Sequence, residues 1–433
     1  MLTQLTTDLC RILKHDFARF DNDASACYDR IIVALAMLAA KKCGMPSHAV
    51  RSHSDALLFM QYAVKTVYGI SETTYKGTVF EPLFGSGQGS GASPSAWLTL
   101  VVILLQTLDR LVPDRINFSC PRRELTHARL SDAFVDDTYL GFTSASQSLS
   151  FESMVAKLQI IGQTWEHLLH LSGGKLNLSK CSWYILRWEW DKGRPVIRPM
   201  HPTDPSIQLQ QGSSSEKTTI QRSALDEPHR MLGVLLNPLG DFGDHIRSLK
   251  TKADTFAIRI LSLRLTSSDV RTFHRSTYVP SMRYGLAAVA VDEEVLGQVQ
   301  SKIVQSILKK WHVQSTIPTA IRHGPAEFGG LGIYDIRTEA GLEAIKIFRG
   351  SIFANSENGK LLRMNLRYSQ LESGIGQPLL ENPGIYLSYI TPSWVVLLRQ
   401  YLYNHNLSPS QIRTNPAFNS KGHKINSSCS NSI

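Results

Sequence analysis

Two adjacent carboxylates, Asp136 and Asp137, stand inside the otherwise apolar and β-prone run AFVDDTYLGF. Because successive side chains of a strand point to opposite faces, the two can serve one site only where the chain turns. The pair therefore predicts the tip of a tight hairpin. Carboxylates held together repel each other unless a cation lies between them, and Mg²⁺ takes one or two protein carboxylates together with water and phosphate oxygens. A site for a divalent cation and a nucleoside triphosphate is one interpretation, and a solvated Asp-Asp turn is the other.

A second acidic segment, FDNDASACYDRI, places Asp21 and Asp23 just before an apolar helical pattern. Catalysis by two metal ions needs carboxylates from separate segments of the chain, and either residue can supply one. Capping of the helix that follows is the competing explanation, because acidic side chains stabilise a helix N-terminus.

The run GSGQGSGASP is rich in glycine and leads into a helix that we expect to begin with Ser93 as its N-cap and Pro94 at its first position. Glycines allow a ligand to approach the backbone closely, and a helix N-terminus offers free N–H groups to an anion. The context excludes a dinucleotide-binding fold, since no strand-like run leads into the loop and no acidic residue follows at the ribose-binding position. A P-loop is excluded because Gly174 and Lys175 are followed by Leu176.

The elements that must position these residues follow from periodicity. Helices are expected over 27–44, 93–113 and 151–174, strands on both sides of the acidic pair, and a hairpin over 181–199 that turns at Asp191, Lys192 and Gly193. A polar stretch over 203–228 predicts a linker or long loop, and an amphipathic helix with a basic surface starts near Ile246. The polar C-terminal tail is expected to be disordered.

Composition narrows the class of protein. The chain has 433 residues, 42% hydrophobic residues and a net charge of +10, which predicts a globular protein of two or three structural units with a polyanionic partner. Six widely spaced cysteines without a C-x-x-C pair argue against a disulfide scaffold or a zinc knuckle. We find no signal peptide and no membrane segment, and expect an intracellular protein, nuclear or cytoplasmic and not secreted.

Two histidines in WEHLLHL, His167 and His170, have a spacing that can bind metal. Because no third ligand lies nearby in the sequence, we interpret them as ordinary residues of a helix surface.

Taken in chain order, the acidic and glycine-rich segments resemble the palm of reverse transcriptases, most of all those of non-LTR (LINE-like) retrotransposons. FDNDASACYDRI is similar to motif A. The resemblance gives Asp23 the metal-binding position and Tyr28 the place of the aromatic gate against a ribose 2′-OH. FVDDT resembles motif C, with Asp136 and Asp137 as its aspartates and Phe134 in place of the more usual Tyr.

The glycine-rich run GQGSGASPSAW is similar to motif B, which positions the incoming nucleotide and the template. Gln88, Ser93 and Pro94 keep the spacing of that motif, and Gly89 adds a further substrate-binding position.

Two later segments complete the resemblance. GGKLNLSKCSWY is similar to motif D, which makes Lys180, or with less support Lys175, the group that protonates the leaving pyrophosphate. MLGVLLNPLG resembles motif E, the primer grip.

The resemblance implies an α+β fold in which a palm of antiparallel strands backed by helices is followed by a mostly helical thumb and an irregular C-terminal region. The expected division is a palm over 1–202, a linker and primer-grip region over 203–245, a thumb-like region over 246–350 and a C-terminal region over 351–433. The fingers of the family precede motif A, and here only a short segment does, so an N-terminally truncated chain is expected.

The implied activity is that of an RNA-directed DNA polymerase. Two Mg²⁺ or Mn²⁺ ions are expected on Asp23, Asp136 and Asp137, with Lys180 as general acid. The expected partners are an RNA template, a DNA primer and deoxynucleoside triphosphates, with no membrane. Two alternatives stay open: a catalytically inactive nucleic-acid-binding remnant without fingers, and an RNA-dependent RNA polymerase.

Overall fold

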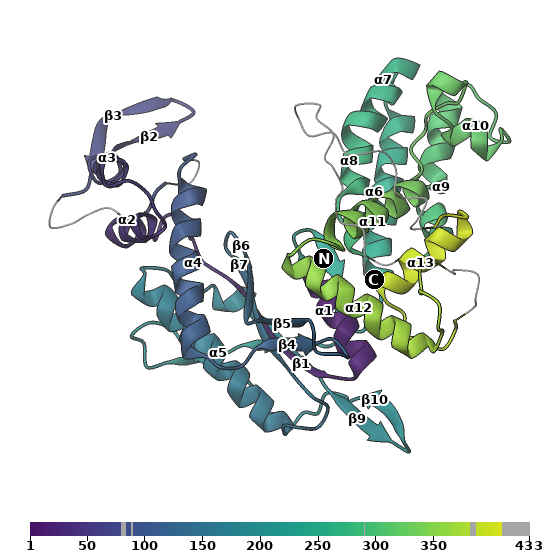
Figure 1. The fold of residues 1–433 in the computed structure, drawn as a ribbon. Helices are drawn as coiled ribbons and strands as arrows, with labels where there is room; N and C mark the ends of the chain where they lie inside the picture. The colour runs from purple at the N-terminus through teal and green to yellow at the C-terminus, as the bar shows by residue number, and fades with distance from the viewer. Residues whose placement is uncertain (79–83, 88–89, 290, 382–386, 409–433) are drawn as a thin grey trace. The chain divides into compact units, whose positions relative to one another are not determined.

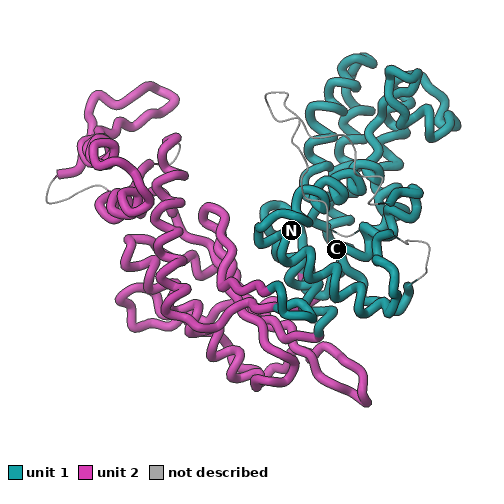
Figure 2. Tube along the Cα trace, viewed as in Figure 1, with its two compact units in different colours: residues 1–13, 119–125, 228–433 teal, residues 14–118, 126–227 magenta. Residues whose placement is uncertain are grey.

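The computed structural model describes residues 1–78, 84–87, 90–289, 291–381 and 387–408. The chain divides into two compact units, which Figure 2 distinguishes by colour. Unit 1 comprises residues 1–13, 119–125 and 228–433, and unit 2 comprises residues 14–118 and 126–227. The predicted four-part division stays a prediction, although the first 13 residues are grouped here with the C-terminal half. Within the described residues, no helix has the length and apolar character needed to cross a membrane.

Unit 2 contains most of the strands (Figure 1). Its elements in chain order are β1 (Asp16–Asp23), α2 (Val33–Lys42), α3 (Ser47–Leu58), β2 (Gln61–Thr66), β3 (Gly69–Lys76), α4 (Ser93–Leu111), β4 (Ile116–Ser119), β5 (Thr126–Arg129), β6 (Ser131–Phe134), β7 (Asp137–Ser144), α5 (Phe151–Leu171), β8 (Ser182–Leu186), β9 (Trp188–Asp191), β10 (Arg194–Ile197), β11 (Gln208–Gln210), β12 (Lys217–Thr219) and β13 (Gln221–Arg222).

A five-stranded sheet in the order β13-β8-β1-β7-β6 forms the centre of unit 2. The strand β1 lies antiparallel between β7 and β8, while β13 joins β8 in parallel. One face of this sheet packs on helices, because Phe20, Leu140 and Trp183 share a buried core with residues of α4 and α5. The expected α+β architecture, an antiparallel sheet backed by helices, is thus confirmed.

Most of the elements that periodicity predicted are present. The helices α4 and α5 and the hairpin of β6 and β7 lie where the sequence placed them. The predicted helix over 27–44 is shorter, since α2 begins only at Val33, and it is not buried all round, because Leu38 is 63% exposed. The hairpin of β9 and β10 turns at Lys192 and Gly193 as expected.

The expectation of a linker over 203–228 is wrong. This segment contains β11, β12 and β13, and three of its apolar residues, Ile207, Leu209 and Ile220, are at most 1% exposed in the core of unit 2. Ile207 and Leu209 are two positions apart, so both point to the same face of the strand, and this short alternation is enough to bury that face.

Unit 1 is mostly helical (Figure 1). Its elements in chain order are α1 (Leu2–Leu13), β14 (His229–Met231), β15 (Val234–Leu236), α6 (Gly243–Ser262), α7 (Ser267–Phe273), α8 (Val279–Arg283), α9 (Glu293–Lys310), α10 (Thr319–His323), α11 (Ile336–Ser351), α12 (Glu357–Ser373) and α13 (Trp394–Asn404). The predicted basic amphipathic helix is α6, which buries Leu249, Ala253 and Ile260 and leaves Lys250 and Lys252 exposed. The C-terminal tail lies outside the described residues.

The first helix is held in unit 1 by a buried carboxylate. Asp8 of α1 is fully buried and accepts hydrogen bonds from the backbone N–H of Trp394 and from the side chain of Gln4, each at 2.9 Å. Burial raises the pKa of Asp8 to about 6. The side-chain amide of Asn365 in α12 donates to the carbonyl oxygen of Leu5 at 3.0 Å, which fixes α1 to the C-terminal helices.

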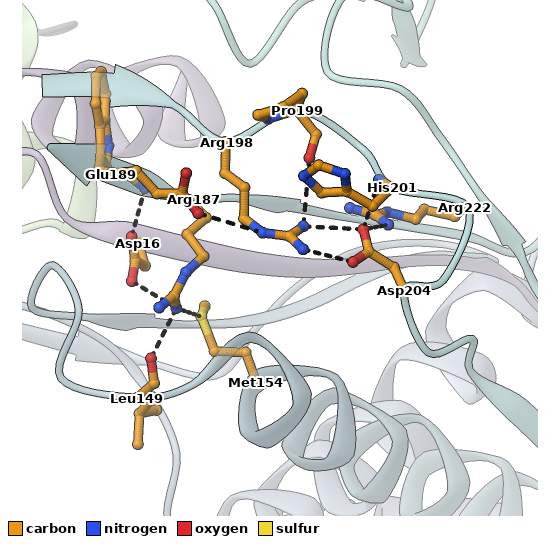
Figure 3. A network of polar contacts seen from close by, with 11 residues as sticks. Asp16, Leu149, Met154, Arg187, Glu189, Arg198, Pro199, His201, Asp204 and Arg222 are labelled. Atoms are coloured by element: carbon orange, nitrogen blue, oxygen red, sulfur yellow. Dashed lines mark hydrogen bonds and ion pairs between the residues drawn. The ribbon is translucent and has the colours of Figure 1, made fainter. Parts of the chain in front are cut away.

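A polar network in unit 2 ties the segment after β10 to the sheet (Figure 3). Asp204 accepts hydrogen bonds from Arg198 at 2.9 and 2.6 Å and from Arg222 at 2.5 Å. Both guanidinium groups also lie over the ring of Phe151, at 4.3 and 4.9 Å from its centroid. These contacts join the 198–204 segment to β13 and to the start of α5.

The same view shows a second ion pair at the start of β1 (Figure 3). The side chain of Arg187 donates to the carbonyl oxygen of Leu149 at 2.8 Å and pairs with Asp16 at 3.4 Å, while the N–H of Trp188 donates to Asp16 at 2.8 Å. Both carboxylate oxygens of the buried Asp16 thereby accept a hydrogen bond.

We predict that Asp204→Asn lowers the free energy of unfolding by about 2 kcal/mol at neutral pH, because the charge-assisted hydrogen bonds from Arg198 and Arg222 lose their anion. Arg198 and then Arg222 hold the pKa of Asp204 below its usual range. The unfolded chain therefore takes up the proton first, so the advantage of the wild type is complete above the unfolded pKa of about 4 and shrinks as the pH falls through the folded pKa.

Urea unfolding of both chains from neutral to acidic pH measures this difference. Asp191→Asn, at an exposed strand end, is the matched control and should change stability little. A stability gap that is independent of pH would contradict the proposed role of the Asp204 charge.

Candidate active site

The acidic pair lies at a hairpin, as predicted. Phe134 pairs with Asp137, so the two-residue turn between β6 and β7 consists of Val135 and Asp136. On the other side of β7, Asp137 lies directly opposite Asp23 of β1. Residues directly opposite on antiparallel strands project from the same face with neighbouring Cβ atoms. The register therefore brings carboxylates from two distant segments together.

The hairpin tip is fixed to both neighbouring elements. The carbonyl oxygen of Asp136 accepts a hydrogen bond at 3.0 Å from the N–H of Ala24, just beyond Asp23. The indole Nε1 of Trp97, in α4, donates to the carbonyl oxygen of Val135. Val135 has a φ of 56°, which is rare for a β-branched residue and costs conformational energy.

The face of the sheet that carries the carboxylates is polar. Along β1, Arg19, Asp21 and Asp23 alternate with the buried Ala18 and Phe20 of the helix-packed face. Arg19 is only 4% exposed and forms an ion pair with Asp21. Asp21 is therefore neutralised by a neighbour on its own strand, whereas Asp23 lies at the strand end.

The cation nearest to Asp23 is Lys180. Its ammonium lies 3.2 Å from the carboxylate, and its side chain is 63% exposed while that of Asp23 is 16% exposed. The segment that carries Lys180 is held to β1, since the N–H of Asn177 donates to the carbonyl oxygen of Asp23 at 2.9 Å. The other lysine that the sequence suggested, Lys175, takes part in no ion pair among the described residues.

The pKa values of groups in the site are raised, because the site is partly buried and several carboxylates lie close together. Burial raises the pKa of Asp137, and the charges of Asp136 and Asp23 raise it further, while Lys180 acts in the opposite direction. Burial and then the charge of Asp136 raise the pKa of the Cys27 thiol to about 11. These shared influences indicate one electrostatic site.

The donor chemistry of the site suits a hard divalent cation, which prefers carboxylate oxygens and would relieve the repulsion between Asp23 and Asp137. Mg²⁺ needs only one or two protein carboxylates. Among the described residues, however, no group of three or more His, Cys, Asp and Glu side chains is arranged as a ready metal site. The fit therefore rests on the pair of opposed carboxylates and on Asp136 beside them.

The alternative of helix capping by Asp21 or Asp23 does not hold. The helix α2 begins ten residues beyond Asp23, its N-cap is Ile32, and its first turn has no acidic residue. Both aspartates belong instead to strand β1, which no periodic pattern in the sequence predicted.

The glycine-rich loop closes against the segment that follows β1. The N–H groups of Gly85 and Ser86 each donate at 2.8 Å, to the carbonyl oxygens of Ile31 and Tyr28. A Cβ on Gly85, whose φ is +92°, would lie 2.6 Å from the Cα of Asp29. The approach is thus possible only for glycine at this position.

Ser93 has a different role from the predicted one. The N-cap of α4 is Ala92, and Ser93 is the first residue of the helix. Its buried hydroxyl shares its hydrogen between the carbonyl oxygens of Ser86 and Gly87, at 2.9 and 2.8 Å, and so ties the loop to the helix. Pro94, in the first turn, is exposed.

The remaining predicted substrate-binding residues are placed as follows. Tyr28 lies partly buried in the turn after β1, and burial, then Cys27 and Asp136, raise the pKa of its hydroxyl. Phe134 ends β6 with 56% exposure. Gln88 and Gly89 lie outside the described residues. The site roles of all these residues stay predictions.

Three residues of the site were missed from the sequence. Arg19 has the spacing from Asp21 that puts both on one strand face, but this signal exists only once the strand is known. Trp97 belongs to the apolar pattern of a predicted helix, and nothing in the sequence indicated that its indole would donate a hydrogen bond to Val135. Tyr139 was interpreted only as part of the apolar run after the acidic pair. In the structure the guanidinium of Arg19 lies over its ring, 4.5 Å from the ring centroid.

No protein-family model matches the chain, and no curated protein matches it. Similar solved structures are telomerases of two yeasts. Telomerase from Candida albicans in complex with a TWJ fragment of telomeric RNA has a TM-score of 0.31 and 13% identity, over 84% of this chain and 52% of that chain. Apo telomerase from Candida tropicalis has a TM-score of 0.31 and 11% identity, over 84% of this chain and 55% of that chain. Telomerase from Candida tropicalis in complex with the TWJ fragment has a TM-score of 0.35 and 10% identity, over 84% of this chain and 51% of that chain.

The chain spans about half the length of these telomerase chains. At such low TM-scores the similarity carries no argument about function, so function must be inferred from the site itself.

We predict that Val135→Gly raises the free energy of unfolding, by up to about 2.5 kcal/mol. Relief of the left-handed conformation is worth about 1–3 kcal/mol, and glycine costs about 0.5–1 kcal/mol in chain entropy. The hydrogen bond from Trp97 goes to the backbone and is kept.

Ala133→Gly, in the adjacent strand, is the matched control and should destabilise by the entropy cost alone. Chemical denaturation of both variants gives the comparison. If Val135→Gly destabilises as much as the control, the conformation of Val135 stores no strain.

Proposed function

We propose that unit 2 catalyses template-directed nucleotidyl transfer to a primer 3′-OH, as an RNA-directed DNA polymerase. The observation that carries the proposal is the register that sets Asp23 opposite Asp137, with Asp136 in the adjoining turn. Opposed carboxylates from two segments are what a two-metal nucleotidyl transferase requires of its protein. The order of the acidic, glycine-rich and lysine-containing segments favours the reverse transcriptase of a LINE-like retrotransposon.

In this proposal Asp23, Asp136 and Asp137 would hold two Mg²⁺ or Mn²⁺ ions, which when bound activate the attacking hydroxyl and stabilise charge on the leaving group. The exposed ammonium of Lys180 stands beside Asp23 and can give a proton to the leaving pyrophosphate. Most of the rate would come from positioning and electrostatic stabilisation, as in other phosphoryl transfers.

The rest of the proposed complex follows from the surrounding elements. The closed glycine loop and α4 would support the incoming deoxynucleotide beside the hairpin, and the RNA template and DNA primer would be the polyanions that the +10 charge favours. In unit 1, the hairpin of β14 and β15 turns tightly at Leu232 and Gly233, and the hydroxyl of Tyr284 donates to the carbonyl oxygen of Leu232 at 2.6 Å. This fixed hairpin is the candidate primer grip.

A second candidate is a protein that binds nucleic acid without catalysis. Two observations favour it: the described residues hold no ready group of three metal ligands, and Lys180 already pairs with Asp23. This function predicts nucleic-acid binding that weakens with salt and an absence of primer extension.

We predict that the chain extends a DNA primer on an RNA template with Mg²⁺ or Mn²⁺, and that Asp136→Asn reduces the rate at least about a hundredfold. Asp191→Asn is the matched control, since it removes one carboxylate from an exposed strand end of the same unit. Circular dichroism verifies that both variants are folded. Extension by Asp136→Asn at the control rate would refute the proposal, and binding without extension in every chain would establish the second candidate.

We predict that Tyr28→Ala increases incorporation of ribonucleotides relative to deoxynucleotides, because a bulky ring beside the sugar would no longer exclude the 2′-OH. The measurement is primer extension with each nucleotide set. Tyr62→Ala, on the hairpin of β2 and β3, is the control and should leave the ratio unchanged. A wild-type chain that already prefers ribonucleotides would instead indicate an RNA-dependent RNA polymerase.

A further inference from the structure

A cavity of about 460 Å³ opens in unit 2 between the end of α5, the turn after it and the loop that joins β11 to β12. Its size is within the range of small-molecule sites. The residues that line it are mostly polar and include three basic residues, Arg30, His170 and Lys175, against one acidic residue, Glu216. His170 was predicted to be an ordinary residue of a helix surface, and the proposed polymerase mechanism does not use it.

Two basic residues of this cavity, Arg30 and Lys175, are not neutralised by a carboxylate among the described residues. Within the part of the chain that the structure describes, Arg30 and Lys175 form no ion pair, and both are exposed. Other arginines of unit 2 do find carboxylates, as Arg129 does with Asp132 at 3.1 Å and Arg187 does with Asp16 at 3.4 Å. Uncompensated positive charge at a cavity attracts an anion.

One wall of the cavity is fixed by a row of side chains on α5. Gln159 and Gln163 accept hydrogen bonds from the N–H groups of Gln208 and Gln210, at 3.2 and 2.9 Å. One turn further, the buried carboxylate of Glu166 accepts from the N–H of Gly212 at 3.0 Å. These side chains lie on one face of the helix and hold β11 and its loop in place.

The wall is also built from glycines that cannot be replaced without collision. A Cβ on Gly212, whose φ is +56°, would lie 2.9 Å from Cε1 of His170. A Cβ on Gly173, whose φ is +88°, would lie 2.5 Å from the carbonyl oxygen of Arg30. Glycine at both positions therefore lets the ring of His170 and the backbone of Arg30 pack closely against the two segments that form the wall.

We propose that this cavity is a binding site for a phosphate-bearing ligand, which Arg30 and Lys175 recognise by charge while the imidazole of His170 lines the same cavity. Lysine and arginine are the usual partners of phosphate oxygens, and the hydroxyls of Ser213, Ser214 and Thr218 line the same cavity. The phosphate comes either from a free polyphosphate or from the backbone of a nucleic acid. The site does not require the polymerase activity, although the N–H of Ser25 donates to the carbonyl oxygen of Lys175 at 2.7 Å and so joins it to the end of β1.

The test is calorimetric titration of the full chain with inorganic tripolyphosphate and, separately, with a single-stranded oligonucleotide that has no terminal phosphate. A chelator is present throughout, so that metal-dependent binding at the aspartates does not contribute. We expect saturable binding of at least one probe that the double variant Arg30→Ala, Lys175→Ala weakens by about tenfold or more. Tripolyphosphate binding alone identifies a free polyphosphate, and oligonucleotide binding alone identifies backbone phosphate.

Lys65→Ala is the matched control, because Lys65 is an exposed lysine of β2 in the same unit, does not line the cavity and is not one of the proposed catalytic residues. It should leave binding unchanged. A second variant, Glu166→Ala, frees the loop at Gly212 and should weaken binding while both cations remain. No saturable binding of either probe, or a loss caused by Lys65→Ala and not by the double variant, would overturn the proposal.

Discussion

The hydrogen bond from the indole of Trp97 to the carbonyl oxygen of Val135 is the interaction on which the candidate active site depends. It joins α4, whose Trp97 is buried in the core, to the tip of the hairpin that carries the acidic pair. Because the turn contains only Val135 and Asp136, it sets the register in which Asp137 pairs with Phe134. The hydrogen bond from the N–H of Ala24 to the carbonyl oxygen of Asp136 ties the same tip to the end of β1, where Asp137 lies opposite Asp23. A slip of one residue would turn Asp137 toward the helices and expose Leu140, which is buried in the core.

The charges on the polar face of the sheet are distributed unevenly, and this decides where a cation can bind. Asp21 is matched by the buried Arg19, so the middle of β1 is neutral. At the strand end the carboxylate of Asp23 pairs with the exposed Lys180, and the pKa of Asp137 is raised by burial and then by the charges of Asp136 and Asp23. The uncompensated negative charge of this face therefore lies at the hairpin end.

The sequence was sufficient for the elements with strong periodicity and for the position of the acidic hairpin. Helices α4 and α5 have long apolar patterns, and the pair Asp136 and Asp137 could share a site only at a turn. The sequence was insufficient to predict β1, because the charged residues Arg19 and Asp21 interrupt the apolar pattern. Their ion pair becomes evident only in the folded structure. The strands over 203–228 were also missed, because the segment is mostly polar and only a few apolar residues, Ile207, Leu209 and Ile220, pack into the core.

Comparison of hairpins within the chain explains why local rules failed at the site. The turns at Lys192–Gly193 and Leu232–Gly233 place glycine in the left-handed region, as short hairpins prefer. The turn at the acidic pair contains no glycine and puts the β-branched Val135 at a positive φ. A residue held in a costly conformation needs surrounding contacts that determine it, and here the Trp97 indole and the bond from Ala24 to Asp136 supply them. The strain is thus located at the turn that holds the two adjacent carboxylates, and contacts from α4 and from the end of β1 offset its cost.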